Sequence, residues 1–268
     1  MGFCRPCGYD APPGKCSVIT YEYPFNERVR TYLRLEQLFD RVFSLIEDTE
    51  VIEHHFALTT LFEIMDVGAR ADLKSDVMKD LERQKHGMMA YRGNPSIAAE
   101  ALEEVIERLQ ICFDGLNAVP GRAGQSLTDI DWLMGVRSRA AIPGGTCEFD
   151  LPAYFAWKHL PSARRQQDLR NWIHTLRPLA ASIRLLLNLL RQSGSAQRVS
   201  VVGGQYQQSL QQGKTSQLVR VALDRHAELI PEISGNRLVL SIRLMRMGDD
   251  SRLHASGEDA TLDITLCA

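Results

Sequence analysis

The chain has 268 residues, a formal net charge of −2 and 44% hydrophobic residues. This length is enough to bury one large core or two smaller ones, and the composition is typical of a globular protein. The sequence contains no apolar run of about 18 residues and no basic segment followed by an apolar one at its start. We therefore expect neither a membrane span nor a secretory signal, and we expect a cytoplasmic protein.

The first 17 residues contain three of the six cysteines. Cys4 and Cys7 form a Cys-x-x-Cys pair, and Cys16 follows within a segment rich in proline and glycine. A structural zinc site needs four ligands, and no histidine or second cysteine pair lies nearby. Cysteines in a reducing compartment stay free thiols. We predict a flexible extension over residues 1–17, and we expect neither a metal nor a cofactor.

A strand is predicted at residues 18–25, which read VITYEYPF, because β-branched and aromatic residues precede Pro24. Asn26 is the expected N-cap of a long helix over residues 26–46. Apolar residues at helical spacing predict the buried face of this helix. They are Val29, Leu33, Leu35, Leu38, Val42 and Leu45.

Helical periodicity continues to about residue 193. Gly68 and the Gly93-Asn94-Pro95 run are expected stops, Ser96 is expected to open a helix, and Pro178 fits a first helical turn. We predict further helices at residues 51–68, 71–93, 96–116, 128–141, 162–176 and 178–193. Residues 25–195 are therefore predicted to form a helical domain.

After residue 195 the pattern changes to β-branched residues with period two. Strands are predicted at residues 198–208, 217–224, 237–248 and 261–268, with turns at 211–214 and 234–236. The early strand is expected to join the same antiparallel sheet. The predicted class is α+β, a large helical domain inserted into a smaller antiparallel β-sheet domain made of residues 18–24 and 196–268.

Basic residues are concentrated between Lys158 and Arg225, where eleven lysines and arginines accompany only two acidic residues. Such a polarised surface favours an acidic partner: a protein tail, a nucleic acid or an anionic membrane. Five arginines recur every seven residues, a spacing that drifts only about 20° around a helix. They are Arg170, Arg177, Arg184, Arg191 and Arg198. A solvated face and a binding groove both fit this series, which Pro178 divides between two helices.

Residues 142–161, IPGGTCEFDLPAYFAWKHLP, suggest chemistry at first sight. The Pro143-Gly144-Gly145 run lacks the further glycines and the Lys-Ser/Thr pair of a phosphate-binding loop, and it predicts a tight turn. Cys147 and His159 lack a third group that would orient the histidine for nucleophilic catalysis. His54 and His55 are adjacent, so they diverge by about 100° on a helix and do not suit one metal ion. We therefore predict no catalytic residue, no metal site and no enzyme activity.

Several segments together resemble one protein family. They are YEYPFNERVRTYLRLE, LKSDVMKDLERQ, SRAAIPGGTCEFDLPAYFAWKHLP and PEISG, in this order from about Val18 to the C-terminus. These segments are similar to the Z-ring-associated protein D (ZapD) family of bacterial cell-division factors. The resemblance implies a non-enzymatic homodimer at the midcell division ring. It also implies binding to the C-terminal tail of the tubulin-like protein FtsZ, cross-linking of FtsZ filaments into bundles, and a helical domain paired with an antiparallel β domain.

Given this resemblance, we interpret residues 142–161 as scaffold that borders a basic cleft for the FtsZ tail. Phe149, Leu151, Phe155 and Trp157 are the expected anchors to the helical core. The expected tail-binding residues are Arg70, Arg137, Arg139, His159, Arg164, Arg165, Arg237, Arg243 and Arg246. The β domain is the expected dimer interface, because sheet edges are exposed hydrogen-bonding surfaces. The alternative hypothesis is a helical nucleic-acid-binding module that uses the arginine series. A sequence pI of about 6.4, and aromatic residues that do not alternate with those arginines, argue against it.

Overall fold

The computed structural model describes residues 18–70, 72–210 and 215–268. The predicted extension at 1–17 and the predicted turn at 211–214 lie outside these residues. Chain contacts divide the protein into two compact units. The helical unit is Thr31–Asn188, and the β unit is the chain up to Arg30 together with Leu189–Ala268. Among the helices in the described residues, none is both long enough and apolar enough to cross a membrane.

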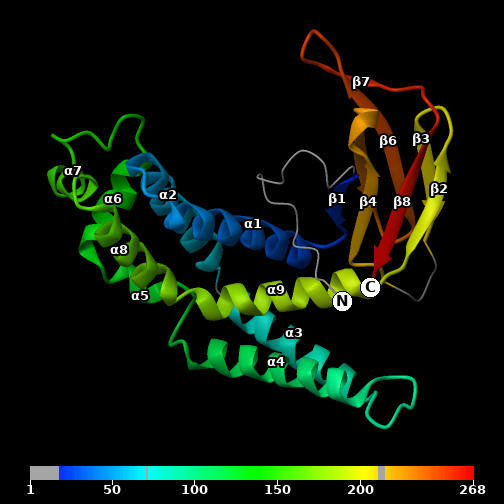
Figure 1. Cartoon of the computed structure of the whole chain (residues 1–268), viewed down its shortest axis with the longest axis horizontal. Coiled ribbons are helices and arrows are strands. Elements are labelled where there is room, and N and C mark those ends of the chain that lie inside the picture. The colour runs from blue at the N-terminus through cyan, green and yellow to red at the C-terminus, as the bar shows by residue number, and fades with distance from the viewer. Residues whose placement is uncertain (1–17, 71, 211–214) are drawn as a thin grey trace. The chain divides into compact units, whose positions relative to one another are not determined.

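Helices occupy the chain between the first and second strands (Figure 1). They are α1 (Glu27–Glu47), α2 (Val51–Gly68), α3 (Leu73–Met89), α4 (Ala99–Ala118), α5 (Gln125–Thr128), α6 (Asp131–Ala140), α7 (Pro152–Lys158), α8 (Ser162–His174) and α9 (Arg177–Gln192). Within the helical unit, α3 packs along α4, and α2 packs on α6 and α8. This order confirms the predicted α+β class with a helical insertion.

The N-cap of α1 is the one that the sequence predicts. Asn26 Oδ1 accepts a hydrogen bond from the Val29 backbone N–H at 2.9 Å. The buried face of α1 is Val29, Tyr32, Leu35, Phe39, Val42 and Ile46. The predicted members Leu33, Leu38 and Leu45 are only half-buried. The apolar stripe is thus wider than the buried face, and the neighbouring helices decide which part of it is covered.

Every strand pair of the β unit is antiparallel. The strands are β1 (Val18–Pro24), β2 (Ala196–Val201), β3 (Gln205–Ser209), β4 (Leu218–Asp224), β5 (Ile230–Gly235), β6 (Val239–Met247), β7 (Leu253–Ala255) and β8 (Ala260–Cys267). One sheet has the order β1-β4-β8-β2, and the other has the order β3-β6-β5 with β7 also paired to β6. The register pairs Val18 with Asp224, which confirms that the early strand joins the C-terminal strands.

The β unit has two sheets where we predicted one, and the core lies between them. Val221 of β4 and Ile264 of β8 share a buried cluster with Leu240 and Ile242 of β6. In β6 the buried residues alternate with exposed Arg243, as the period-two pattern predicts. The pattern identifies which face of a strand is buried, but it does not specify which strands pair. For this reason a single sheet and a two-sheet sandwich could not be distinguished.

Candidate partner-binding surface

The Pro143-Gly144-Gly145 run forms the predicted tight turn. Gly144 has φ = +72°, a left-handed conformation that favours glycine, and the Gly145 N–H donates to the Ile142 carbonyl at 2.9 Å. A Cβ atom on Gly145 would lie 2.5 Å from the Arg139 carbonyl oxygen, so this position also needs glycine. The turn connects α6 to the segment that leads into α7, with Pro152 in its first turn.

Helix α7 is anchored by two aromatic residues, only one of which we predicted. Tyr154 and Trp157 are buried, and they lie three positions apart on one face of the helix. Phe149 is 78% exposed and Phe155 is 39% exposed, so the prediction that these two anchor the segment is wrong. Leu151 is half-buried and occupies the position just before the first residue of the helix. Helical geometry turns Phe155 away from the face that Tyr154 and Trp157 share.

Arg165 is buried inside the helical unit, with only 5% of its surface exposed. Its guanidinium donates to the Thr49 carbonyl at 2.8 Å, to the Lys158 carbonyl at 3.3 Å and to the Leu160 carbonyl. Its Nε donates to His54 Nδ1 at 2.9 Å. The expected tail-binding role of Arg165 does not agree with this burial. The residue instead ties α8 to the ends of α1 and α7.

His54 is held as a neutral imidazole by these contacts. Its Nε2 donates to the Asp48 carbonyl at 2.9 Å, while its Nδ1 accepts from Arg165. Burial lowers the pKa of His54, and the charge of Arg165 adds to this effect, although the bond to Asp48 opposes it. Burial, with the Lys158 charge, also lowers the pKa of neighbouring His55. Both histidines therefore favour the neutral form in the folded protein.

We expect acid to destabilise the helical unit. The unfolded chain takes up protons at these histidines near their ordinary pKa of 6.5. The folded chain takes them up only at lower pH, because both pKa values are lowered there. Their contribution to stability is therefore complete above about pH 6.5 and declines as the pH falls through that value. Thermal midpoints measured by circular dichroism between about pH 8 and pH 5 test this. A His54→Gln variant should show a flatter pH dependence. An unchanged slope in His54→Gln would contradict the assignment.

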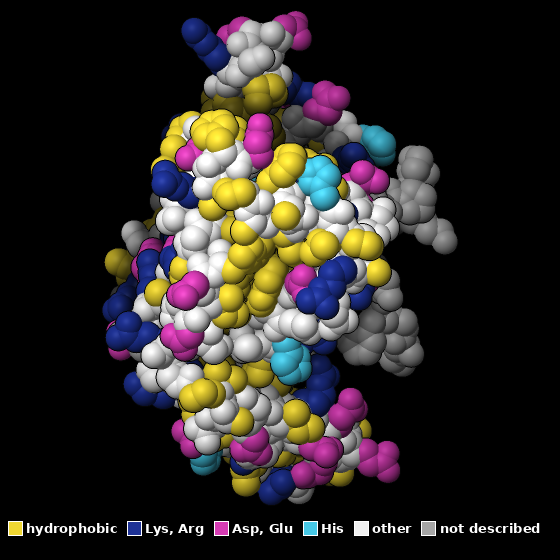
Figure 2. Space-filling model, turned by 90° about the vertical axis from the view of Figure 1, so that its left-hand side faces the viewer, with side chains coloured by type: hydrophobic (Ala, Val, Ile, Leu, Met, Phe, Trp, Pro, Cys, Tyr) yellow, Lys and Arg dark blue, Asp and Glu magenta, His cyan; other side chains and the backbone are white. Residues whose placement is uncertain are grey.

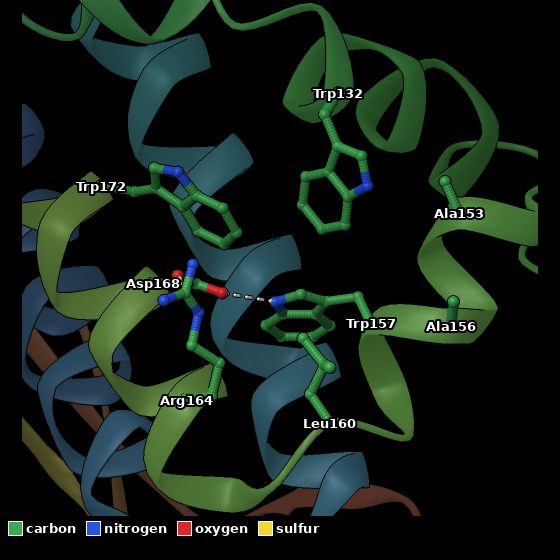
Figure 3. A pocket seen from close by; sticks show the side chains of 8 residues that line it. All are labelled: Trp132, Ala153, Ala156, Trp157, Leu160, Arg164, Asp168 and Trp172. Carbon is green, nitrogen blue, oxygen red and sulfur yellow. Dashed lines mark hydrogen bonds and ion pairs between the residues drawn. The ribbon is translucent and has the colours of Figure 1, made fainter.

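A pocket of about 440 Å³ opens between α6, α7 and α8 (Figure 3). All three tryptophans of the chain line it: Trp132, Trp157 and Trp172. The Trp132 and Trp172 ring centroids lie 5.2 Å apart, and those of Trp132 and Trp157 lie 5.7 Å apart. Figure 2 shows the side of the molecule where these helices lie, with hydrophobic side chains gathered near its middle and charged side chains beside them. We call the pocket lined by the three tryptophans the tryptophan pocket.

Arg164 and Asp168 form the polar edge of the tryptophan pocket. Asp168 Oδ2 accepts a hydrogen bond from the Trp157 indole at 3.1 Å, and Asp168 Oδ1 lies 3.2 Å from Arg164 Nε. The Arg164 side chain is 67% exposed, while that of Asp168 is 16% exposed. Arg164 and Arg165 are thus neighbours in sequence with opposite environments, because successive residues of a helix point about 100° apart.

A second hollow of about 420 Å³ lies between α1 and α2. Four of its seven lining residues are charged, and we call it the charged hollow. Arg41 pairs with Glu63 at 2.7 Å across it, and Arg137 from α6 pairs with Asp66 at its border. Arg70, just beyond α2, donates to Thr31 Oγ1 at 3.3 Å. Of the predicted site residues, Arg70 and Arg137 therefore contact residues of α1 and α2.

Arg139 lies just before the 142–161 segment, and His159 lies near its end. Arg139 is 4.0 Å from Asp150 and half exposed. His159 is exposed, and its Nδ1 lies 2.8 Å from the Phe155 carbonyl at the end of α7. Both side chains are accessible to a partner. Their carboxylate and carbonyl contacts are weak surface interactions that a partner can replace.

The remaining predicted site residues belong to the β unit. Arg237 is exposed in the turn between β5 and β6. Arg243 and Arg246 are on β6, where Arg243 lies 3.7 Å from Glu232 and Arg246 lies 3.0 Å from Glu258. All three are on the surface of this unit.

Most arginines of the seven-residue series are paired with carboxylates. Arg191 is the least exposed of these paired arginines, and it makes two bonds of 2.8 and 2.7 Å to Glu22. Burial would raise the pKa of Glu22, but the bonds and charges of Arg191 and Arg220 outweigh it and lower that pKa. The other pairs are Arg170 with Glu47, Arg184 with Asp40, and Arg198 with Asp263. Internal pairing of this kind is typical of a solvated or structural face and weakens the nucleic-acid hypothesis.

Known proteins resemble this chain over nearly its whole length. The model of the ZapD family, described as cell division protein, matches residues 33–243. Two relatives named Cell division protein ZapD are each 48% identical over 251 residues, 93% of this chain and 99% of theirs. One is from Ralstonia pickettii (strain 12J) and the other from Ralstonia nicotianae (strain ATCC BAA-1114 / GMI1000). The chain belongs to the ZapD family.

Membership of the ZapD family establishes a role in cell division. The family and both relatives are described as cell division proteins, and the absence of catalysis stays a prediction. In the described part of the chain, no three histidine, cysteine or carboxylate side chains gather as metal ligands would. The tryptophan pocket and the charged hollow both lie within the part that the ZapD model matches, whereas Arg246 lies just beyond it.

The tryptophan pocket of this ZapD family member was not predicted from its sequence. We selected Trp157 as an anchor and Arg164 as a binding residue, but we did not connect them with Trp132, Asp168 and Trp172. One signal was available. All the tryptophans of the chain fall between residues 132 and 172, and tryptophans are enriched where proteins bind partners.

Proposed function

We propose that this protein binds the C-terminal tail of FtsZ and, as a homodimer, cross-links FtsZ filaments into bundles at the midcell division ring. The observation that carries the proposal is the tryptophan pocket with the exposed guanidinium of Arg164 at its edge. The FtsZ tail is expected to combine acidic and apolar groups. An arginine fork beside an apolar surface suits such a peptide, because the fork binds carboxylates and the surface buries apolar side chains.

The proposed tail-binding set excludes Arg165, since its donors are committed inside the helical unit. Each remaining side chain reaches the surface with at most weak competition from neighbouring carboxylates. In the helical unit the set comprises Arg70, Arg137, Arg139, His159 and Arg164. In the β unit it comprises Arg237, Arg243 and Arg246.

Bundling requires one protein to hold two filaments. A dimer with one tail site on each copy meets this requirement, and linked sites gain avidity on a polymer that repeats its tails. We propose that the β unit forms the dimer. The edge strands are β1 and β2 in one sheet and β3 and β5 in the other. Their unpaired edges are available for association. This role needs no cofactor and no catalytic residue.

Co-sedimentation with FtsZ and GTP tests the proposed function. We expect the protein to pellet with intact FtsZ filaments and to increase their bundling, because many weak tail contacts act together. Filaments of FtsZ that lacks its C-terminal tail should leave the protein in the supernatant. Electron microscopy of the same samples would separate bundling from simple decoration. Pelleting that is equal with both forms of FtsZ would exclude the tail as the binding element, and no pelleting with either would exclude FtsZ as the partner.

A further inference from the structure

The tryptophan pocket is an exposed binding surface with a defined shape. Trp157 forms its floor, with 6% of its surface exposed, while Trp132 and Trp172 are half-buried at its sides (Figure 3). Small or aliphatic residues of α7 complete the wall, namely Ala153, Ala156 and Leu160. A solvent-open hollow built from indole rings exposes apolar surface that gains free energy when a partner covers it. The small alanine side chains leave the space into which a partner side chain can fit.

The polar edge of the pocket carries an exposed guanidinium that contacts one carboxylate. Asp168 uses one carboxylate oxygen for the Trp157 indole and the other for Arg164 Nε. The Nε edge of Arg164 therefore faces Asp168. Its two terminal nitrogens have no acceptor among the residues that the structure describes, and the side chain is mostly exposed. This arrangement presents a donor pair beside the indole surface, and two parallel donors match the geometry of a carboxylate.

We infer that the tryptophan pocket takes an aliphatic side chain from an acidic segment of the FtsZ tail, while Arg164 holds a carboxylate close to it in that segment. This inference rests on the proposed function and adds to it the element that the pocket recognises. An aliphatic group fills the space between the three indoles and the alanine wall. A carboxylate supplies the acceptor that the terminal nitrogens of Arg164 lack within the described chain.

The ring geometry favours a peptide over a nucleotide. A base stacks on the open face of an aromatic ring or inserts between two parallel rings. Here Trp132 and Trp172 stack on each other with an interplanar angle of 23°. Trp157 is tilted by 56° from Trp132 and by 37° from Trp172. The three rings form a cup and leave no slot between parallel faces. Arg164 is also the sole cation among the lining residues that the structure describes, whereas a nucleic-acid strand needs repeated phosphate contacts.

Tryptophan emission of the full-length protein gives a direct test, because every tryptophan of the chain lines this pocket. The probe is a synthetic peptide with the sequence of the C-terminal tail of FtsZ from the same organism. Calorimetry measures its binding independently of the pocket. We expect the emission titration to give the same dissociation constant as the calorimetric titration. Ala156→Phe, which fills the pocket, and Arg164→Gln, which removes the fork, should each weaken binding about tenfold.

Matched controls separate the pocket from general effects. Ala101→Phe adds the same ring to an exposed position of α4, and Arg170→Gln removes another ion-paired arginine of α8. Both controls should bind the peptide within about twofold of the parent. Thermal midpoints show whether each variant folds. If Ala156→Phe does not fold, Arg164→Gln still tests the inference.

Three results would overturn the inference. Binding in calorimetry without an emission change, and with full affinity in Ala156→Phe and Arg164→Gln, would place the tail elsewhere and leave the proposed function intact. No binding in calorimetry, together with no pelleting in the filament assay, would remove the proposed function and this inference with it. An emission change with a single-stranded oligonucleotide but not with the peptide, lost in Ala156→Phe, would assign the pocket to nucleic acid.

Discussion

Replacing Arg165 by methionine is expected to lower the free energy of unfolding of the helical unit by about 3 kcal/mol. Arg165 is buried and donates to three backbone carbonyls and to His54. Methionine has a similar length but no donor, so it fills the space and leaves these acceptors unsatisfied. Each buried polar group without a partner costs about 1 to 3 kcal/mol, and water reaches part of this set.

Urea denaturation followed by tryptophan fluorescence measures this loss, because all three tryptophans lie in the helical unit. Arg164→Met is the matched control, since it makes the same change at the adjacent but exposed position. It should change stability by less than about 0.5 kcal/mol. Equal destabilisation by the two variants would contradict the structural role of Arg165. The pair also separates stability from binding, because we expect Arg164→Met to weaken tail binding while it preserves the fold.

Reversing the charge of both Arg137 and Arg139 to glutamate is expected to weaken FtsZ-tail binding about 100-fold. The side chains of Arg137 and Arg139 are 33% and 49% exposed near the segment that precedes α7, so an acidic tail can reach them. The reversal replaces two attractions with two repulsions, and like charges brought together at an interface cost several kcal/mol. Calorimetry with the tail peptide measures the effect, and the thermal midpoint detects any damage to the fold.

The control for this double variant is Arg92→Glu combined with Arg170→Glu. These arginines are also exposed, and each pairs with one glutamate, so the net charge and the number of broken ion pairs change equally. We expect this control to bind the peptide with nearly the parent affinity. Unchanged binding by the Arg137 and Arg139 variant would remove both residues from the site. Equal weakening by the control would indicate that only the overall charge of the protein matters.

Long elements with clear periodicity could be predicted from the sequence. Helices α1, α2 and α9, and strands β1 and β4, begin and end within a few residues of their predicted bounds. Helix α7 was missed because its seven residues are too few for a periodic pattern. Strand β5 was missed because its segment begins with Ile230-Pro231 and ends in glycine, which favours a turn. An edge position in the sheet tolerates that proline.

The candidate site could be predicted only in part. Composition and the family resemblance directed attention to arginines near residues 137–165, and the structure places most of them on the surface. The sequence could not separate Arg164 from Arg165, because identical neighbouring side chains carry no sign of which one faces inward. The tryptophan pocket brings together residues from α6, α7 and α8. Its existence depends on how these helices pack, which a single sequence does not specify.

The pairing of β1 with β4 has a consequence for synthesis of the chain. Val18 emerges from the ribosome early, yet its partner Asp224 is made about 200 residues later. At about 5 to 20 residues per second, this delay lasts about 10 to 40 seconds. The helical unit, Thr31–Asn188, is complete before β4 exists and has time to fold on its own. In the cell, β1 therefore exists before the strand with which it pairs, and this edge of the sheet can close only after β4 has been made.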